Sequence, residues 1–205
     1  MHTHSLAQYI DCIERDDWLG VGELMLSSAH RLAAAGASFL ISPDNTIHQA
    51  FTYVEPRSPL PWIHIVDAVI AHAVERGFRR VGLMGTRRLV DSGIYPDRLA
   101  QRGIEAVRPT DAERESIDRI IFDELVKGIV TVEALKCFQL AIERFARERC
   151  DSVILGCTEI PLIVNDANSA LPTLDSTRLL ARAALRRAVG AAATARAPHT
   201  SQIFD

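Results

Sequence analysis

Hydrophobic residues recur with two different periods along the chain, and the periods alternate. Short apolar runs rich in β-branched residues are typical of buried strands, and longer segments with apolar residues every three or four positions are typical of helices. The short runs predict strands at 38–41, 62–66, 80–84, 104–107, 153–155 and 171–174. The longer segments predict helices at 5–17, 21–36, from about 47, 67–76, 96–102, 111–127, 132–149 and 176–193. This alternation predicts an α/β fold with a parallel sheet and crossover helices.

Two polar motifs follow predicted strands directly. Ser42-Pro43-Asp44-Asn45-Thr46 follows the run at 38–41, and Gly156-Cys157-Thr158-Glu159 follows the run at 153–155. In open α/β sheets, ligands bind beyond the carboxyl ends of the strands. The two motifs therefore predict one site assembled from distant halves of the chain.

Cys157 is the candidate reactive group of the second motif. If a helix begins after the turn, its free N–H groups and dipole favour a thiolate that acts as base or nucleophile. The alternative is a buried strand-end cysteine without chemistry, which is the commoner case. Gly156 allows close backbone approach, and Thr158 and Glu159 can orient a polar ligand, so the motif favours function. The remaining cysteines, Cys12, Cys137 and Cys150, are interpreted as packing or surface residues.

The first motif and its neighbours have two interpretations. Asp44-Asn45-Thr46 can hold a carboxylate or an amine, or it can form an Asx turn that caps a helix. Gly85-Thr86, after the strand at 80–84, has the same two interpretations. Arg87-Arg88 is suited to a substrate carboxylate, although solvated loop arginines are more common. His48 is interpreted equally as a packing residue or as a site residue, and His64 is interpreted as a hydrogen-bonded core histidine.

Composition narrows the class of protein. The 205 residues include 48% hydrophobic and 24% charged residues, and the formal net charge is −3. This charge gives no reason to expect a nucleic acid or an anionic membrane as partner. No apolar run approaches the roughly 20 residues of a membrane span, and no signal peptide is recognisable. We therefore expect a cytoplasmic protein, and no Cys or His spacing predicts a metal site.

Several segments together carry a resemblance to a known family. The segments are Asp44-Asn45-Thr46-Ile47-His48, Gly82–Thr86 followed by Tyr95–Leu99, Ile121-Phe122-Asp123-Glu124-Leu125, Leu155–Pro161, and Leu174-Asp175-Ser176-Thr177. In this order they resemble motifs of the aspartate/glutamate racemase family, the cofactor-independent amino-acid racemases. The resemblance covers nearly the whole chain.

The resemblance implies a fold of two similar parallel-sheet lobes with the site between them. We expect residues 1–66 plus 175–205 to form the N-terminal lobe and 67–174 the second lobe. The implied reaction is racemisation of a small, possibly acidic, amino acid by two facing acid/base groups, without cofactor or metal. By position, Asp44 and Cys157 are the implied pair. The implied substrate-binding residues are Asn45, Thr46, Thr86, Thr158 and Glu159, and a homodimer is expected.

The chain departs from the family pattern in three places. Asp44 stands where the family has its first cysteine, and Leu89 stands where a hydroxyl residue is expected. Met1 falls just before the helix that precedes the Asp44 motif, so we expect the first strand of the family fold to be absent. These departures keep two alternatives open: a single-cysteine lyase or isomerase of a small carboxylic acid, and a catalytically impaired paralogue that binds a carboxylate.

Overall fold

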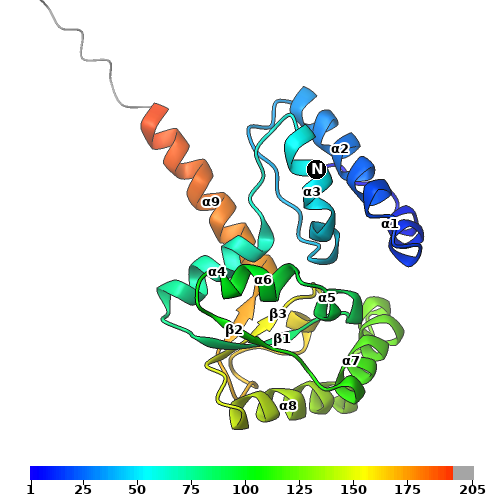
Figure 1. The fold of residues 1–205 in the computed structure, drawn as a ribbon, viewed down its shortest axis with the longest axis vertical. Coiled ribbons are helices and arrows are strands. Elements are labelled where there is room, and N and C mark those ends of the chain that lie inside the picture. The colour runs from blue at the N-terminus through cyan, green and yellow to red at the C-terminus, as the bar shows by residue number, and fades with distance from the viewer. Residues whose placement is uncertain (196–205) are drawn as a thin grey trace, which may run out of the picture.

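The computed structural model describes residues 1–195, and a four-stranded parallel sheet lies at the centre of its larger half (Figure 1). The strands are β1 (Arg80–Met84), β2 (Glu105–Val107), β3 (Ser152–Leu155) and β4 (Thr173–Asp175), in the order β2-β1-β3-β4. All pairs are parallel, with Leu83 of β1 opposite Ile154 of β3. The predicted α/β class with a parallel sheet is therefore confirmed.

Helices cover both faces of this sheet (Figure 1). One hydrophobic cluster joins the sheet to α7 (Asp111–Asp123) and α8 (Val132–Arg147). A second cluster joins it to α4 (Ile65–Glu75), α6 (Ile94–Ala100) and the first turns of α9 (Ser176–Ala195). Every residue of β3 is buried, as expected for a strand that is covered on both faces.

Two of the differences from the periodicity-based helix prediction have a clear local cause. The helix predicted at 111–127 ends at Asp123, because the chain continues as a 3-10 turn, Leu125–Lys127, that closes on Gly128 with a left-handed φ of 73°. The loop predicted after Thr86 contains a short helix, α5 (Arg87–Asp91), which the hydroxyl of Thr86 caps by accepting a hydrogen bond from the Leu89 N–H.

The first part of the chain is mainly helical. It contains α1 (Leu6–Glu14), α2 (Trp18–Ala34), a 3-10 helix at Thr46–Ala50, α3 (Phe51–Val54) and a 3-10 turn at Glu55–Arg57, around a third hydrophobic cluster. The strands predicted at 38–41 and 62–66 reduce to one parallel bridge between Leu40 and Trp62. The second prediction was wrong beyond Trp62, because the imidazole of His64 accepts the Val66 N–H and starts α4 at Ile65.

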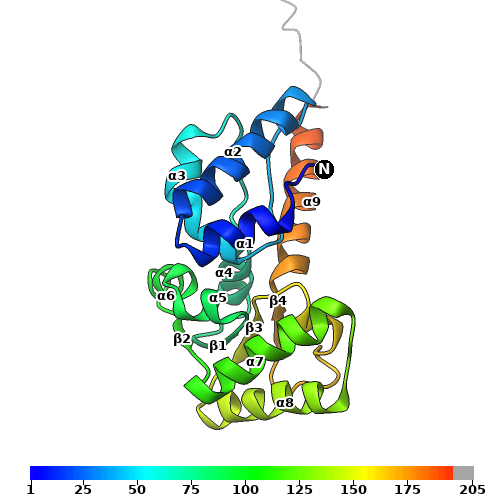
Figure 2. The same ribbon diagram turned by 90° about the vertical axis from the view of Figure 1, so that its right-hand side faces the viewer.

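Helix α9 leads from the sheet back towards the N-terminal helices (Figure 2). Leu179 and Leu180, in its first turns, pack with the sheet cluster, and Arg187 lies over the ring of Phe39 at 5.0 Å. The residues beyond 195 that were expected in the N-terminal lobe lie outside the described part. Within the described residues, no helix combines the length and apolar character needed to cross a membrane.

Asp166 binds Thr173, the first residue of the edge strand β4, and this contact gives a first prediction. Its carboxylate accepts hydrogen bonds from the N–H and the hydroxyl of Thr173, both at 2.7 Å, and these bonds are the main cause of the lowered pKa of Asp166. We expect Asp166→Ala to lower the free energy of unfolding by about 1 kcal/mol at pH 7. Folding lowers the pKa of Asp166. The two hydrogen bonds therefore contribute their full stability above the pKa that Asp166 has in the unfolded chain, and this contribution is lost as the pH falls through the lower pKa of the folded state.

Urea denaturation of both proteins at pH 7 and in the acid range below pH 4 checks this expectation. The gap between Asp166→Ala and the parent should shrink in acid. An equal gap at both pH values would contradict the assignment. Asp123→Ala, at the exposed end of α7, is the matched control, and it should change stability less at pH 7.

Candidate functional site

The Asp44 turn forms one wall of the candidate site. The Oδ1 atom of Asp44 accepts hydrogen bonds from the N–H groups of Thr46 (2.7 Å) and Ile47 (3.2 Å), so the Asx turn considered from the sequence is present. Both bonds use the same carboxylate oxygen. Burial raises the pKa of the Asp44 carboxyl, the two N–H groups lower it, and the charge of Glu159 raises it further.

The turn just past the end of β3 carries Cys157 and is the second wall of the candidate site. The side chain of Cys157 is buried, and its Sγ lies 2.8 Å from Oε2 of Glu159. Burial and the Glu159 carboxylate raise the pKa of the thiol to about 12, while the backbone N–H groups of Glu159 and Ile160 oppose the shift. The thiol is protonated at neutral pH and donates its hydrogen to Glu159.

This state corrects the expectation that a helix dipole stabilises a thiolate at Cys157. The segment after the turn is a 3-10 helix of three residues, Ile160–Leu162, and not a long α-helix. The N–H groups of Glu159 and Ile160 lower the pKa of the Cys157 thiol, as expected, but burial and the Glu159 carboxylate raise that pKa by more.

Three threonines supply hydroxyl groups at the two walls. The hydroxyl oxygens of Thr46 and Thr86 lie 3.4 Å apart, although the residues are 40 positions apart in the sequence. The hydroxyl of Thr158 donates to Oε1 of Glu159 at 2.7 Å. In the structure, Thr46 thus contacts Thr86, and the side chains of Thr158 and Cys157 both contact the Glu159 carboxylate.

Asn45 belongs to a buried chain of hydrogen bonds between the walls. Its amide nitrogen donates to the hydroxyl of Ser176 (3.0 Å), and its amide oxygen accepts from the hydroxyl of Tyr95 (2.7 Å). Ser176 in turn donates to the carbonyl of Leu155, the last residue of β3 (2.9 Å). The chain of bonds ties the Asp44 turn to the strand that carries Cys157. Tyr95 and Ser176 were recognised from the sequence as motif members, but their contact with Asn45 was not predicted.

The imidazole of His48 is hydrogen-bonded to the backbone of the Asp44 turn. Its Nδ1 donates to the carbonyl of Asp44 at 2.7 Å, its Nε2 accepts the Ile65 N–H at 3.4 Å, and its ring stacks on Phe51. Burial lowers the pKa of His48 to about 3, and it does the same for His64. Both imidazoles are neutral and buried, so His64 is the hydrogen-bonded core histidine predicted from the sequence, and His48 has the packing role that was one of its two interpretations.

Leu89 fills the space beside the two strand-end glycines. It is fully buried, and a Cβ added to Gly85 or Gly156 would lie 2.8 or 2.6 Å from its Cδ2. Close packing requires a glycine at 156, because a Cβ there would also lie 2.9 Å from the backbone oxygen of Met84. The position at which the family pattern has a hydroxyl is apolar here.

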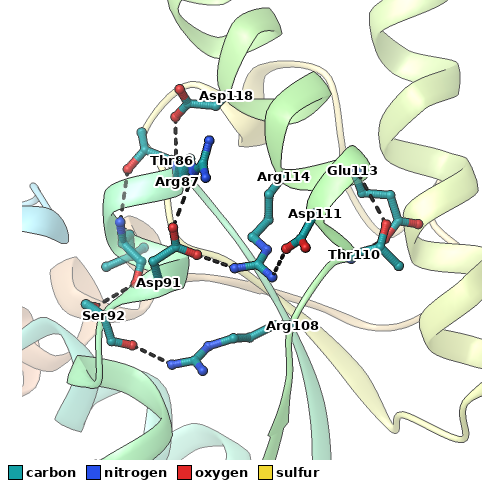
Figure 3. A network of polar contacts seen from close by, with 11 residues as sticks. Thr86, Arg87, Asp91, Ser92, Arg108, Thr110, Asp111, Glu113, Arg114 and Asp118 are labelled. Atoms are coloured by element: carbon teal, nitrogen blue, oxygen red, sulfur yellow. Dashed lines mark hydrogen bonds and ion pairs between the residues drawn. The ribbon is translucent and has the colours of Figure 1, made fainter.

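Two hollows adjoin these elements. One, of about 500 Å³, is lined by Trp18 and Gln49 of the N-terminal part and by Arg87, Arg88 and Phe122 of the sheet part, among others. Arg88 pairs there with Asp16 at 2.7 Å. Figure 3 shows the adjoining wall, where the N–H of Arg87 bonds to Asp118 and Arg114 reaches both Asp91 and Asp111. A larger hollow, of about 610 Å³, lies beside β4. Among the described residues, no group of three or more His, Cys, Asp or Glu side chains is arranged to hold a metal ion.

The contact between Cys157 and Glu159 gives a second prediction. Because Glu159 raises the pKa of the thiol, Glu159→Gln should lower that pKa and increase the thiolate fraction. We expect iodoacetamide to alkylate Cys157 several-fold faster at pH 8.5 in the variant, measured by mass spectrometry of the Cys157 peptide. Glu115→Gln, the same change on the exposed face of α7, should leave the rate unaltered. An unchanged rate in Glu159→Gln would refute the coupling.

Comparison with known proteins identifies the family. Residues 1–184 match the family model described as Asp/Glu/Hydantoin racemase. The chain belongs to this family. The resemblance predicted from the sequence motifs is thereby confirmed, and the match extends over both walls of the candidate site.

Individual members of the Asp/Glu/hydantoin racemase family agree with this placement. The solved structure of a candidate Asp/Glu racemase from Yersinia pestis has a TM-score of 0.84 and 32% identity, and the match covers 91% of this chain and 81% of that one. An aspartate racemase homologue from Pyrococcus horikoshii OT3 has a TM-score of 0.76 and 31% identity, with 85% and 76% covered. The broad specificity amino-acid racemase RacX of Bacillus subtilis is 22% identical over 158 residues, which are 77% of this chain and 68% of RacX.

Proposed function

We propose that the protein is a cofactor-independent racemase of a small α-amino acid, in which Cys157 and Asp44 exchange the α-proton from opposite faces. The observation that supports this proposal is the buried thiol of Cys157, which lies at the end of β3 with its Sγ 2.8 Å from Oε2 of Glu159, in a chain that belongs to a racemase family. Amino-acid racemase is also the printed description of RacX, which shares 22% identity over most of this chain.

In the proposed reaction, one group removes the α-proton and the other returns a proton to the opposite face. Glu159 accepts the hydrogen of the Cys157 thiol in the resting site, so it is placed to take that proton when the thiolate is needed as base. Burial raises the pKa of Asp44 and so brings this carboxyl closer to the range useful for proton transfer. The hydroxyls of Thr46, Thr86 and Thr158, with nearby backbone N–H groups, are proposed to hold the α-carboxylate, and Asn45 to contribute through its remaining N–H.

Deuterium exchange tests the proposal directly. The protein is incubated in D₂O with single amino acids, and proton NMR follows the loss of the α-proton signal while chiral chromatography follows the opposite enantiomer. We expect α-deuteration together with racemisation for at least one amino acid. A single-cysteine lyase is the second candidate function, because Asp44 replaces the first cysteine of the family pattern. Release of CO₂ from a malonate-type acid, without exchange of an amino-acid α-proton, would favour this lyase. Binding of carboxylates without any chemistry would favour the impaired paralogue.

Assembly and lobe boundaries belong to the same proposal. We propose that residues 1–66 with 175–205, and residues 67–174, are the lobes that flank the site, and that two chains associate as a homodimer in the cytoplasm. Light scattering at micromolar concentration should give twice the chain mass of 22.6 kDa. A monomer under these conditions would remove the dimer from the proposal.

A further inference from the structure

The larger hollow, of about 610 Å³, lies along β4, the edge strand of the sheet. Its lining comes from helices α4 and α9, from the strand ends and from the segment between β3 and β4. Among the described residues that line it, none belongs to the set proposed to hold or react with the substrate. Sites for small organic ligands have volumes of roughly 300–1,000 Å³. The hollow is therefore large enough to be a second ligand site.

Two neighbouring helices each contribute a pair of basic residues to this hollow. His72 and Arg76 lie one turn apart at the C-terminal end of α4, and Arg178 and Arg182 lie one turn apart in α9. Residues four positions apart are on the same face of a helix. Since α4 and α9 pack against each other in one hydrophobic cluster, their basic faces meet in the same hollow.

The positive charge of the hollow is only partly neutralised by the protein. Arg178 forms an ion pair with Asp175 at 3.2 Å, and the carboxylate of Asp166 is hydrogen-bonded to the start of β4. Arg76 and Arg182 form no ion pair with any described residue, although the charge of Arg76 acts on Asp166 from a longer distance. The lining thus has three arginines against two carboxylates, and an anion can neutralise the remaining charge.

Apolar side chains are also part of the lining. Leu155, Leu174 and Leu179 come from β3, β4 and α9, and Phe78 comes from the segment after α4. The guanidinium of Arg76 lies over the ring of Phe78, with 5.4 Å between Cζ and the ring centroid. An apolar ligand body would displace water from these side chains, while an anionic group on the same ligand would bind the guanidinium. An inorganic anion gains only the second of these contributions.

We propose that the hollow between α4, α9 and β4 binds a small organic anion in which an apolar body carries one carboxylate or phosphate group. Arg76 and Arg182 bind the anionic group, and the leucines of the lining contact the apolar body. Arginine suits this role because its planar set of donors matches both carboxylate and phosphate oxygens. The hollow is separate from the proposed substrate site, so the inference is independent of the proposed racemase activity.

Calorimetric titration of the full chain with four probes tests the inference. 2-Naphthoate and 2-naphthyl phosphate have the proposed combination of groups, 2-naphthylmethylammonium has the same ring with a cation, and inorganic phosphate lacks the ring. We expect at least one naphthyl anion to bind about tenfold more tightly than the ammonium probe and inorganic phosphate. The naphthyl anion that binds more tightly identifies the anionic group. Equally tight binding of the ammonium probe or of inorganic phosphate, or no binding of either naphthyl anion, would overturn the inference.

Arginine variants then assign the binding to this hollow. Arg76→Gln and Arg182→Gln each remove one exposed guanidinium, and each should weaken the binding of the naphthyl anion about tenfold. Arg102→Gln, which changes an exposed arginine after α6 outside the hollow, should leave the dissociation constant unchanged. Urea denaturation establishes that the three variants are folded. An equal loss of affinity in Arg102→Gln would reduce the effect to net charge and overturn the inference.

A variant of the proposed substrate site controls for binding of the probes there. Thr46→Ala removes a hydroxyl from that site, and it should leave the affinity for the naphthyl anions unchanged. A loss of affinity in Thr46→Ala with no loss in Arg76→Gln and Arg182→Gln would assign the probes to the substrate site. Unaltered affinity in both arginine variants would overturn the inference, whatever the result for Thr46→Ala.

Discussion

Replacing Cys157 with serine should reduce α-proton exchange by about 10³-fold while the fold remains intact. Serine has nearly the same size and can still donate a hydrogen bond to Glu159, whose Oε2 lies 2.8 Å from Sγ. Its hydroxyl is a far weaker acid than a thiol, so the environment that raises the pKa of Cys157 to about 12 would place a serine hydroxyl out of reach of any side-chain base. The measurement is the rate of α-deuteration in D₂O for the amino acid that the parent protein exchanges fastest.

The comparison needs a cysteine variant without a role in the site. Cys137 is partly buried on α8 and packs against the cluster on that face of the sheet. Cys137→Ser should therefore keep the exchange rate within a factor of two. Circular dichroism and urea denaturation establish that both variants are folded. Undiminished exchange in Cys157→Ser would end the assignment of Cys157 as an acid/base group.

The second large effect concerns stability. Asn45→Ala should lower the free energy of unfolding by about 3 kcal/mol, because it removes two buried hydrogen bonds, one to the Ser176 hydroxyl and one from the Tyr95 hydroxyl. Tyr95 is fully buried, and burial raises the pKa of its phenol, so the hydroxyl remains neutral and depends on a hydrogen-bond partner. Urea denaturation at pH 7 measures the change.

A double-mutant cycle shows whether the loss comes from this contact. Tyr95→Phe removes the donor, so its effect and that of Asn45→Ala should be clearly less than additive when combined. Gln49→Ala is the control amide, since its contacts to the carbonyls of Thr46 and Arg88 are longer and only partly buried. Gln49→Ala should cost less than 1 kcal/mol, an order-of-magnitude bound for such hydrogen bonds. Additive effects of Asn45→Ala and Tyr95→Phe would contradict the proposed coupling.

The strands and helices of the larger half were predictable because their signals are local. The apolar runs that became β1 and β3 lie between helix-period segments, and a buried parallel strand requires such a run whatever its neighbours are. The strands predicted at 38–41 and 62–66 had the same local pattern, but strand pairing also requires a partner ladder. In those segments Leu40 pairs only with Trp62, and the chain then starts helix α4, which His64 caps, so no strand ladder continues.

The candidate site was predictable as a set of motifs and not as an arrangement. Gly156-Cys157-Thr158-Glu159 and Asp44-Asn45-Thr46 were selected because each follows an apolar run. The links between them join residues far apart in sequence: Asn45 with Ser176, Tyr95 with Asn45, and Thr46 with Thr86. Local patterns contain no information about such pairs, and motif order alone indicated that they belong together.

The sequence by itself determined the α/β class, the family and the residues at which chemistry is expected, because periodicity and short motifs are properties of neighbouring positions. The tertiary structure alone decided the charge state and the surroundings of those residues. Cys157 is a protonated thiol against Glu159, and the arginines that follow Thr86 are paired with Asp91 and Asp16. Burial and Coulomb interactions act between groups that only folding brings together, so these properties cannot be read from the order of residues.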